Sequence, residues 1–307
     1  MKLGHILSHA SGPSYRDCHF LGLRFDARRG FKRDVGESWV IQHEGGSLHA
    51  VLGMQAWFTG LWRSPAGHVY VSDSAGQVHV NDHPGRASAS WRKDPLPGVL
   101  TGIWGLDDRC VFTWGVHGDD TVLYRWDGTA WSRMDSPGRV IGMHGISPDL
   151  VYAVGNDGLI ARLDGDRWLP QPAPLRAVLS DVFVASPDEM YAVGAGGWML
   201  EGSVHGWSVL LEGPGPMFGV ARLGDEVLVG AASEGLMRLD GNRLVPVEKM
   251  LKAERIDARS ALLVSSPEFI GERRPDGKWE GLPASQFADL VRNQRPLWLP
   301  LANASRR

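Results

Sequence analysis

Cysteine is scarce in this 307-residue chain, and the two present, Cys18 and Cys110, lie far apart without a Cys-x-x-Cys pair. Neither a disulfide framework nor a cysteine metal site is indicated. Long apolar runs are also missing: none approaches the roughly 18 residues of a membrane span. The start, MKLGHILSHASGPSYRD, is interrupted by His5, Ser8 and His9 before it reaches signal-peptide length. We expect a cytoplasmic protein in a bacterium-like setting, with no membrane partner.

An excess of one charge is absent as well. Lys and Arg number 32 against 35 Asp and Glu, the formal net charge is −3, and no run of five like charges occurs. Nucleic acid is not an expected partner, because phosphate binding needs a concentrated basic face. The chain also lacks a G-x-S-x-G elbow, a phosphate-binding glycine loop and a recognisable Cys-His pairing. We therefore predict neither an enzyme nor a cofactor.

Two histidine-rich segments suggest metal ligands at first sight. HVNDH (His79–His83) holds His, Asp and His within five residues, but in a strand its two histidines would lie about 13 Å apart. We interpret it as a polar surface turn. HEGGSLH (His43–His49) departs from the H-E-x-x-H spacing of a zinc helix. No metal site is predicted.

An internal repeat dominates what is present. DGTAW begins at Asp127, DGDRW at Asp164, DGNRL at Asp240 and DGKW at Asp276. A second motif recurs at the same period of about 40 residues, as in LVYAVGNDGLIARL around Tyr152 and EMYAVGAGGWMLEG around Tyr191. Each unit also has an upstream apolar segment: TGLWRS, TGIWGL, IGMHGI, SDVFVA and FGVARL. Short β-type runs joined by Gly-containing turns predict hairpins.

Four antiparallel strands per 40 residues is typical of a propeller blade. We predict an all-β fold, a single β-propeller of seven four-stranded blades, with six as the alternative. Inner strands are expected to start near Leu21, Gly60, Gly102, Gly142, Asp181, Gly219 and Ala258. We expect strands from both termini to close the ring in one blade, because a closed ring leaves no exposed sheet edge.

The propeller is expected to occupy residues 1–283. ASQFADLVRN, from Ala284, has Phe287, Leu290 and Val291 at helical spacing. Residues 284–307 are therefore predicted to form a short helix and a tail packed on the propeller.

The phrases GISPDLVYAVGNDGLIARLDGDRW and VFVASPDEMYAVGAGGWMLEG resemble bacterial β-propeller repeats, divergent relatives of WD and YVTN-type repeats, which run V-W-G-x-S-P-x-D-V-Y-A-V-G, then a Gly turn, then D-G-x-x-W. The resemblance covers about residues 59 to 247. It implies architecture rather than activity, since propellers serve as enzymes, sugar binders and protein docks.

The candidate binding residues are the places where inner segments vary: Trp62, Trp104, His144 and Phe183 stand at one position of the repeat. They would form an aromatic collar at one mouth of the channel, or alternatively pack between blades. His117, Asp119 and Asp120 form an acidic loop and are further contact candidates. The recurrent Trp91, Trp131, Trp168, Trp207 and Trp279 are interpreted as packing residues.

Two functions remain open. The first is a non-catalytic propeller whose partner is another protein, as a bacterial immunity protein (antitoxin) bound to a cognate toxin or as an assembly scaffold. The second is a carbohydrate-binding or carbohydrate-active propeller, for which Trp62, Trp104 and His144 would form a stacking platform.

Overall fold

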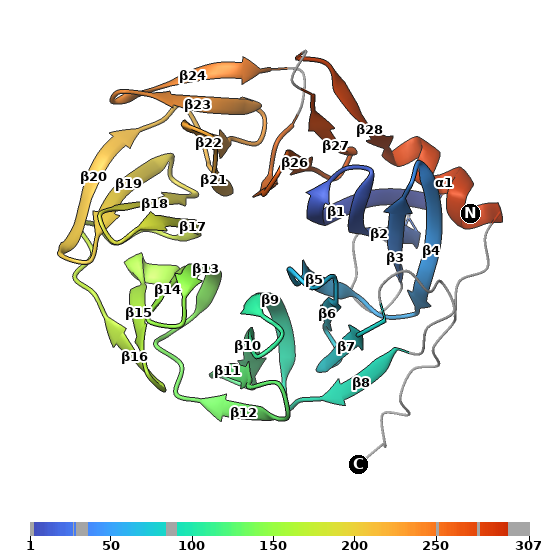
Figure 1. Ribbon diagram of the computed structural model, residues 1–307, viewed down its shortest axis with the longest axis horizontal. Coiled ribbons are helices and arrows are strands. Elements are labelled where there is room, and N and C mark those ends of the chain that lie inside the picture. Colours follow the sequence, from blue (N-terminus) through green and yellow to red (C-terminus); the bar gives the residue numbers. More distant parts are fainter. Residues whose placement is uncertain are drawn as a thin grey trace.

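A computed structural model describes residues 3–26, 28, 36–83, 91–249, 252–274 and 277–293. The chain forms seven four-stranded antiparallel sheets, arranged in a ring as the blades of a propeller (Figure 1). The predicted seven-bladed propeller is therefore confirmed.

Blade 1 consists of β1 (Leu3–Ser14), β2 (Asp17–Asp26), β3 (Glu37–Glu44) and β4 (Ser47–Met54). Blade 2 consists of β5 (Phe58–Arg63), β6 (Val69–Asp73), β7 (Gln77–Asn81) and β8 (Arg92–Pro95). Blade 3 consists of β9 (Val99–Asp107), β10 (Cys110–His117), β11 (Asp120–Trp126) and β12 (Trp131–Met134). Blade 4 consists of β13 (Val140–Ser147), β14 (Leu150–Gly155), β15 (Ile160–Asp164) and β16 (Arg167–Pro170), with the short turn η1 (Asn156–Gly158) between β14 and β15.

Blade 5 consists of β17 (Leu179–Ser186), β18 (Glu189–Gly194), β19 (Trp198–Ser203) and β20 (Gly206–Glu212). Blade 6 consists of β21 (Gly219–Leu223), β22 (Glu226–Gly230), β23 (Leu236–Asp240) and β24 (Arg243–Glu248). Blade 7 consists of β25 (Arg255–Ala258), β26 (Leu262–Ser265), β27 (Phe269–Arg273) and β28 (Trp279–Pro283).

The repeated phrase around Tyr152 forms the middle of blade 4. All six residues of β14 are buried, because both faces of a middle strand are covered by neighbouring blades. Asp164 pairs with Arg167 across a two-residue turn whose first residue, Gly165, has φ +59°. That backbone conformation favours glycine, which explains why Asp-Gly recurs at this place in the repeat.

The closure of the ring differs from the prediction. Every blade is built from four consecutive strands, so none combines strands from the two ends of the chain. Leu21 lies in β2, because the first inner strand is β1, and Ala258 is the last residue of β25 rather than its start. Repeat signals in the first and last blades are too weak to set their register from sequence.

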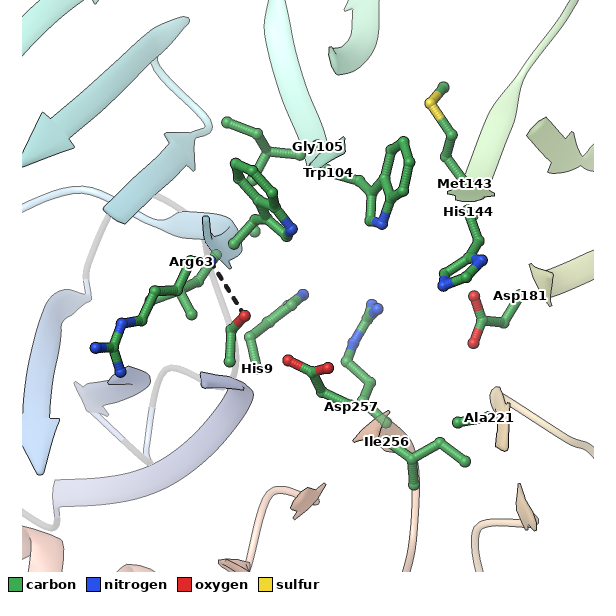
Figure 2. Close-up of a pocket in the computed structure, with 18 of the residues that line it drawn as sticks. His9, Arg63, Trp104, Gly105, Met143, His144, Asp181, Ala221, Ile256 and Asp257 are labelled. Carbon is green, nitrogen blue, oxygen red and sulfur yellow. Dashed lines mark hydrogen bonds between the residues drawn. The ribbon is translucent and has the colours of Figure 1, made fainter. Parts of the chain in front are cut away.

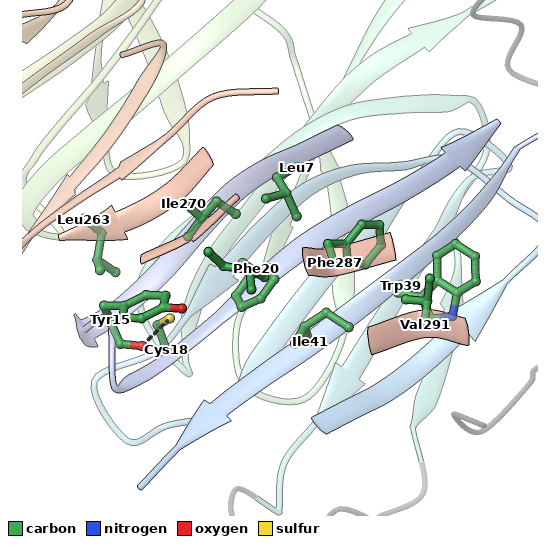
Figure 3. Close-up of a cluster of buried hydrophobic side chains, with 11 residues drawn as sticks. Leu7, Tyr15, Cys18, Phe20, Trp39, Ile41, Leu263, Ile270, Phe287 and Val291 are labelled. Atoms are coloured by element: carbon green, nitrogen blue, oxygen red, sulfur yellow. Dashed lines mark hydrogen bonds between the residues drawn. The ribbon is translucent and has the colours of Figure 1, made fainter. Parts of the chain in front are cut away.

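Side chains and a helix join blade 1 to blade 7 instead. The helix α1 (Ala284–Asn293) follows the last strand and packs against blade 1 (Figure 1). Figure 3 shows Phe287 and Val291 of this helix in one cluster with Phe20 of blade 1 and Ile270 of blade 7. Phe287 is fully buried, and its ring meets the Trp39 ring edge-on with centroids 5.9 Å apart. The end of the chain therefore covers the joint between first and last blades. The tail predicted after the helix lies outside the described residues.

The recurrent outer-strand tryptophans pack between blades, as interpreted from their recurrence. Trp168 of blade 4 meets Phe112 of blade 3 at 5.9 Å, and Trp207 of blade 5 meets Tyr152 of blade 4 at 5.8 Å. The indole N–H of Trp131 donates a 3.0 Å hydrogen bond to Asp94 of blade 2. Each ring joins its blade to the preceding one. Within the described chain, no helix is both long and apolar enough to span a membrane.

Candidate functional site

A hollow of about 600 Å³ lies among the inner strands and is lined by residues of all seven blades. A second hollow of about 410 Å³ lies on blades 1, 2, 3 and 7. Both hollows include His9, Thr101 and Arg255 in their walls, so these residues stand where the two meet.

Two layers of equivalent inner-strand positions, aligned by strand register and by contacts with the next blade, line the larger hollow at every position except Gly219. We call the first layer the collar. From blade 1 to blade 7 the collar residues are Ser11, Trp62, Trp104, His144, Phe183, Ala221 and Asp257. The second layer lies two residues earlier and is called the waist. The waist residues are His9, Gly60, Gly102, Gly142, Asp181, Gly219 and Arg255.

Aromatic rings make the collar contacts from blade 2 to blade 5. The Trp62 ring is buried and packs so closely on the next blade that a Cβ at Gly105 would lie 2.7 Å from it. Trp104 and His144 have ring centroids 5.8 Å apart, and His144 and Phe183 4.6 Å apart. The backbone N–H of Val184, on blade 5, also donates to His144 Nδ1 at 3.1 Å. These rings line the hollow and join neighbouring blades at the same time.

Polar groups make the collar contacts between blades 7, 1 and 2. Asp257 Oδ2 accepts from the Gly12 N–H at 3.4 Å, and Ser11 Oγ accepts from the Arg63 N–H at 3.1 Å. The Arg259 guanidinium, on blade 7, donates to Ser11 Oγ at 2.9 Å and to the Arg63 carbonyl at 2.8 Å, and it pairs with Asp257 at 3.3 Å. Arg259 thus connects three blades at the ring closure.

The waist is mostly glycine, with three titratable exceptions. A Cβ at Gly60, Gly142 or Gly219 would lie about 3 Å from the next blade's inner-strand backbone, so glycine lets these inner strands approach closely. Asp181 instead reaches the next blade, where its Oδ2 accepts from the Val220 N–H at 3.0 Å. His9 sits in a bulge of β1 with φ +44°. Figure 2 shows His9 and Asp181 pointing into the hollow from opposite sides.

The surrounding protein shifts the pKa values of the titratable waist residues and of His144 in the collar. Burial raises the pKa of Asp181 to about 7, against the opposing effect of its backbone N–H donors. Burial lowers the pKa of His144 to about 4, and burial together with Arg255 holds the pKa of His9 well below its ordinary value. Burial also lowers the pKa of Arg255, although a guanidinium stays protonated at any physiological pH. Near neutral pH both histidines are uncharged and Arg255 is a cation.

The structure brings four of the predicted site residues together and leaves three apart. The four rings that line the larger hollow are Trp62, Trp104, His144 and Phe183. Both interpretations of these rings therefore apply, because they line the hollow and also pack between blades. His117, Asp119 and Asp120 form an exposed tight turn between β10 and β11. That turn lies beside Val99, at the opposite end of blade 3 from the Leu106 part of the lining.

The two histidines of the HVNDH segment lie in different environments, His79 in the core and His83 at the surface. His79 is fully buried in β7, where Nε2 lies 2.8 Å from Asp73 Oδ2, so its interpretation as part of a surface turn was wrong. Asp73 also accepts from the Ala75 and Gln77 N–H groups, so the pair secures the β6–β7 turn. His83 is exposed, as predicted. Among the described residues, no group of three His, Cys, Asp or Glu side chains could hold a metal ion.

The lining residues that were not predicted from sequence include His9, Ser11, Asp181, Arg255 and Asp257. A signal existed for Asp181, because SDVF places an acid where TGLW, TGIW and IGMH have glycine. The others belong to blades 1 and 7, which lack clear repeat motifs.

Solved structures show the fold, and one curated protein matches half of the chain. No protein-family model matches the chain. Immune protein Tsi7 of Pseudomonas aeruginosa is 28% identical over 162 residues, which is 50% of each chain, so the match spans about half the length of that curated relative.

Solved propellers of similar shape include the WD40 domain of Doa1, with TM-score 0.67 and 11% identity over 86% of this chain and 94% of that one. YCF48 from Cyanidioschyzon merolae has TM-score 0.63 and 11% identity over 91% and 98%. YCF48 bound to D1 peptide has TM-score 0.58 and 13% identity over 92% and 91%. At these identities the likeness shows the β-propeller fold alone.

Proposed function

We propose that this chain is a non-catalytic, protein-binding propeller that acts as an immunity protein, holding a cognate toxin at the mouth of the larger hollow. The match to Tsi7, itself an immune protein, is the observation that carries the proposal. Bacterial origin and cytoplasmic residence are part of the same proposal. An assembly scaffold would use the same surface, and differs in the identity of the partner.

The chemistry of the hollow supports a protein ligand. Four collar positions offer aromatic surface, and Ser11 and Asp257 offer hydrogen-bonded polar groups, a mixture typical of protein contacts. Ile146 is 47% exposed and follows the lining residue Gly145, which adds apolar surface at this mouth. The YCF48 structure with D1 peptide supports the idea that a propeller of this shape can hold a peptide.

The same rings give weaker support to sugar binding. A sugar stacks on an open ring face, whereas Trp104 lies between Phe112 and His144, and His144 lies between Trp104 and Phe183. Trp62 is 7% exposed. The protein-binding role is therefore preferred to the carbohydrate-binding alternative.

Co-purification tests the proposal directly. The tagged chain, expressed in its native host and lysed gently, is expected to recover one stoichiometric protein. That protein should arrest growth when it is expressed alone, and co-expression of this chain should restore growth. A chain that purifies alone would contradict a protein-binding role, and a harmless partner would contradict the immunity role.

A pair of surface variants tests the location of the contact. Ala66 is exposed and lines the larger hollow, whereas Asp119 is exposed on the turn at the other end of blade 3. Ala66→Arg is expected to weaken partner capture at least tenfold, because the long charged side chain would occupy the mouth. Asp119→Arg is the matched control and should capture the partner as well as wild type does.

A further inference from the structure

The larger hollow is lined by one guanidinium whose hydrogen-bonding needs the described protein does not meet. Arg63 donates to the Asp17 carboxylate at 2.6 Å and to its carbonyl at 3.0 Å. Arg259 has acceptors on three residues. For Arg255, no hydrogen bond or ion pair of the side chain is made anywhere in the described part of the chain. Arg255 is an exposed residue, and it lines both hollows.

Two of the acids that line the hollow with Arg255 already accept hydrogen bonds. Asp181 Oδ2 accepts from the Val220 N–H, and Asp257 accepts from Gly12 and from Arg259. The group left without a partner is therefore a donor with a positive charge, and its complement is an anionic acceptor. Asp181 and Glu254 lie within electrostatic range of Arg255. Their presence disfavours a doubly charged anion such as phosphate and favours a singly charged carboxylate.

The surroundings of Arg255 suit a carboxylate carried on an apolar stem. The Trp104 and Phe183 rings, in the same hollow, offer surface for methylene or ring carbons. His9 Nδ1 is buried without a hydrogen-bond partner, which provides a second polar atom at the waist. The backbone that presents His9 has φ +44°, a conformation that costs energy in a non-glycine residue and is often found at functional sites.

We propose that Arg255 binds a carboxylate of the protein partner, from an acidic side chain or a chain terminus that enters the larger hollow and reaches the waist. The inference rests on the proposed function for the source of the carboxylate. Arg255 is the waist position of blade 7, where four other blades have glycine, and it lines both hollows.

Matched acid and amide probes test this site on the whole chain by calorimetric titration. The first pair is N-acetylglutamate α-amide against N-acetylglutamine α-amide. The second is N-acetylglycylphenylalanine with a free against an amidated C-terminus. At least one acid should bind at least tenfold tighter than its amide, and the successful pair identifies a side-chain or a terminal carboxylate as the source.

Variants assign that preference to Arg255. Arg255→Met should abolish the acid-over-amide preference, and Arg255→Lys, which retains the charge without the fork, should reduce it. Arg243→Met, on the outer strand β24 and 73% exposed, is the control that should keep it. Unchanged melting temperatures confirm folding. Equal binding of acid and amide to the wild type, or a preference that survives in Arg255→Met, would overturn the inference.

Partner capture separates this inference from the proposed function. If wild type and Arg255→Met recover the partner with equal affinity, the immunity proposal stands and the role of Arg255 fails. If no partner is recovered while an acid probe binds through Arg255, the carboxylate site stands and the protein-binding role fails.

Discussion

The two halves of the collar join neighbouring blades through different kinds of contact. From blade 2 to blade 5, equivalent positions carry Trp62, Trp104, His144 and Phe183, and neighbouring blades meet through rings. Between blades 7, 1 and 2 the same layer carries acid and hydroxyl groups bound by backbone N–H donors and by Arg259. The aromatic half lies within continuous chain, whereas the polar half joins the two ends of the sequence.

The difference indicates where the orientation of one blade against the next depends on directional contacts. Ring stacking tolerates a range of angles, and the covalent chain already places consecutive blades. At the closure no covalent link positions blade 7 against blade 1, so directional hydrogen bonds and a buried helix cluster set the joint. Four variants test this contrast between the aromatic and the polar joints.

Phe287→Ala should have the largest effect, because this ring of α1 is fully buried against blades 1 and 7. We expect a loss of about 3–5 kcal/mol in the free energy of unfolding, measured by urea denaturation. Phe183→Ala, in the aromatic half and partly exposed, is the matched control with an expected loss below about 2 kcal/mol. Equal losses would show that the closure is not the more demanding joint.

Arg259→Met should have the next largest effect. It leaves the Ser11 hydroxyl, the Arg63 carbonyl and Asp257 each with one donor fewer. We expect about 1–3 kcal/mol of destabilisation in the same assay. Arg243→Met removes an exposed pair with Asp240 on β24 and should change stability by less than about 0.5 kcal/mol. Similar values for the two variants would remove the special role of Arg259.

Acidification should weaken the fold through buried neutral histidines. The folded-state pKa of His144 is lowered to about 4 and that of His19 to about 3, both below the unfolded value of 6.5. Their contribution is present above pH 6.5 and is lost as pH falls towards the folded values, because the unfolded chain binds more protons. His144→Asn should give a shallower decline of the unfolding free energy between pH 6.5 and pH 4. Identical slopes in variant and wild type would contradict this.

Asp181→Asn should change the pH dependence of stability in the opposite sense. The folded-state pKa of about 7 exceeds the unfolded 3.8, so the stability linked to Asp181 is present in acid and is lost as pH rises through 7. The amide oxygen can still accept from Val220. The variant should therefore gain stability relative to wild type between pH 5 and pH 8, measured by thermal melts. A constant difference across that range would refute the assignment, and Asp119→Asn on the exposed turn provides the control.

Much of the fold was predictable because its signals are local. Gly165 and Gly241 adopt the positive φ that the Asp-Gly motif predicts, and the period of about 40 residues matches four strands in each blade. The helix after Pro283 was evident from the spacing of Phe287, Leu290 and Val291. The path of closure was not predictable, because it depends on contacts between residues more than 240 positions apart, such as those of Gly12 with Asp257.

The candidate site was predictable in its aromatic half only. Trp62, Trp104, His144 and Phe183 could be aligned because the surrounding repeat supplies a register. Arg255 and Asp257 lie in RIDA, a short segment whose register becomes clear only when β25 is paired with β26. The His117 turn was noticed in sequence as an acidic loop, but the sequence did not show that it lies at the other end of its blade from the larger hollow.

By itself the sequence determined the type of blade and favoured seven of them, because hairpin turns and strand alternation act over a few residues and repeat along the chain. Only the tertiary structure decided that His9, Asp181 and Arg255 share one waist and that Arg259 connects blades 7, 1 and 2. The physical reason is that closing a ring brings distant side chains within hydrogen-bonding range, and no local pattern encodes which of them will meet.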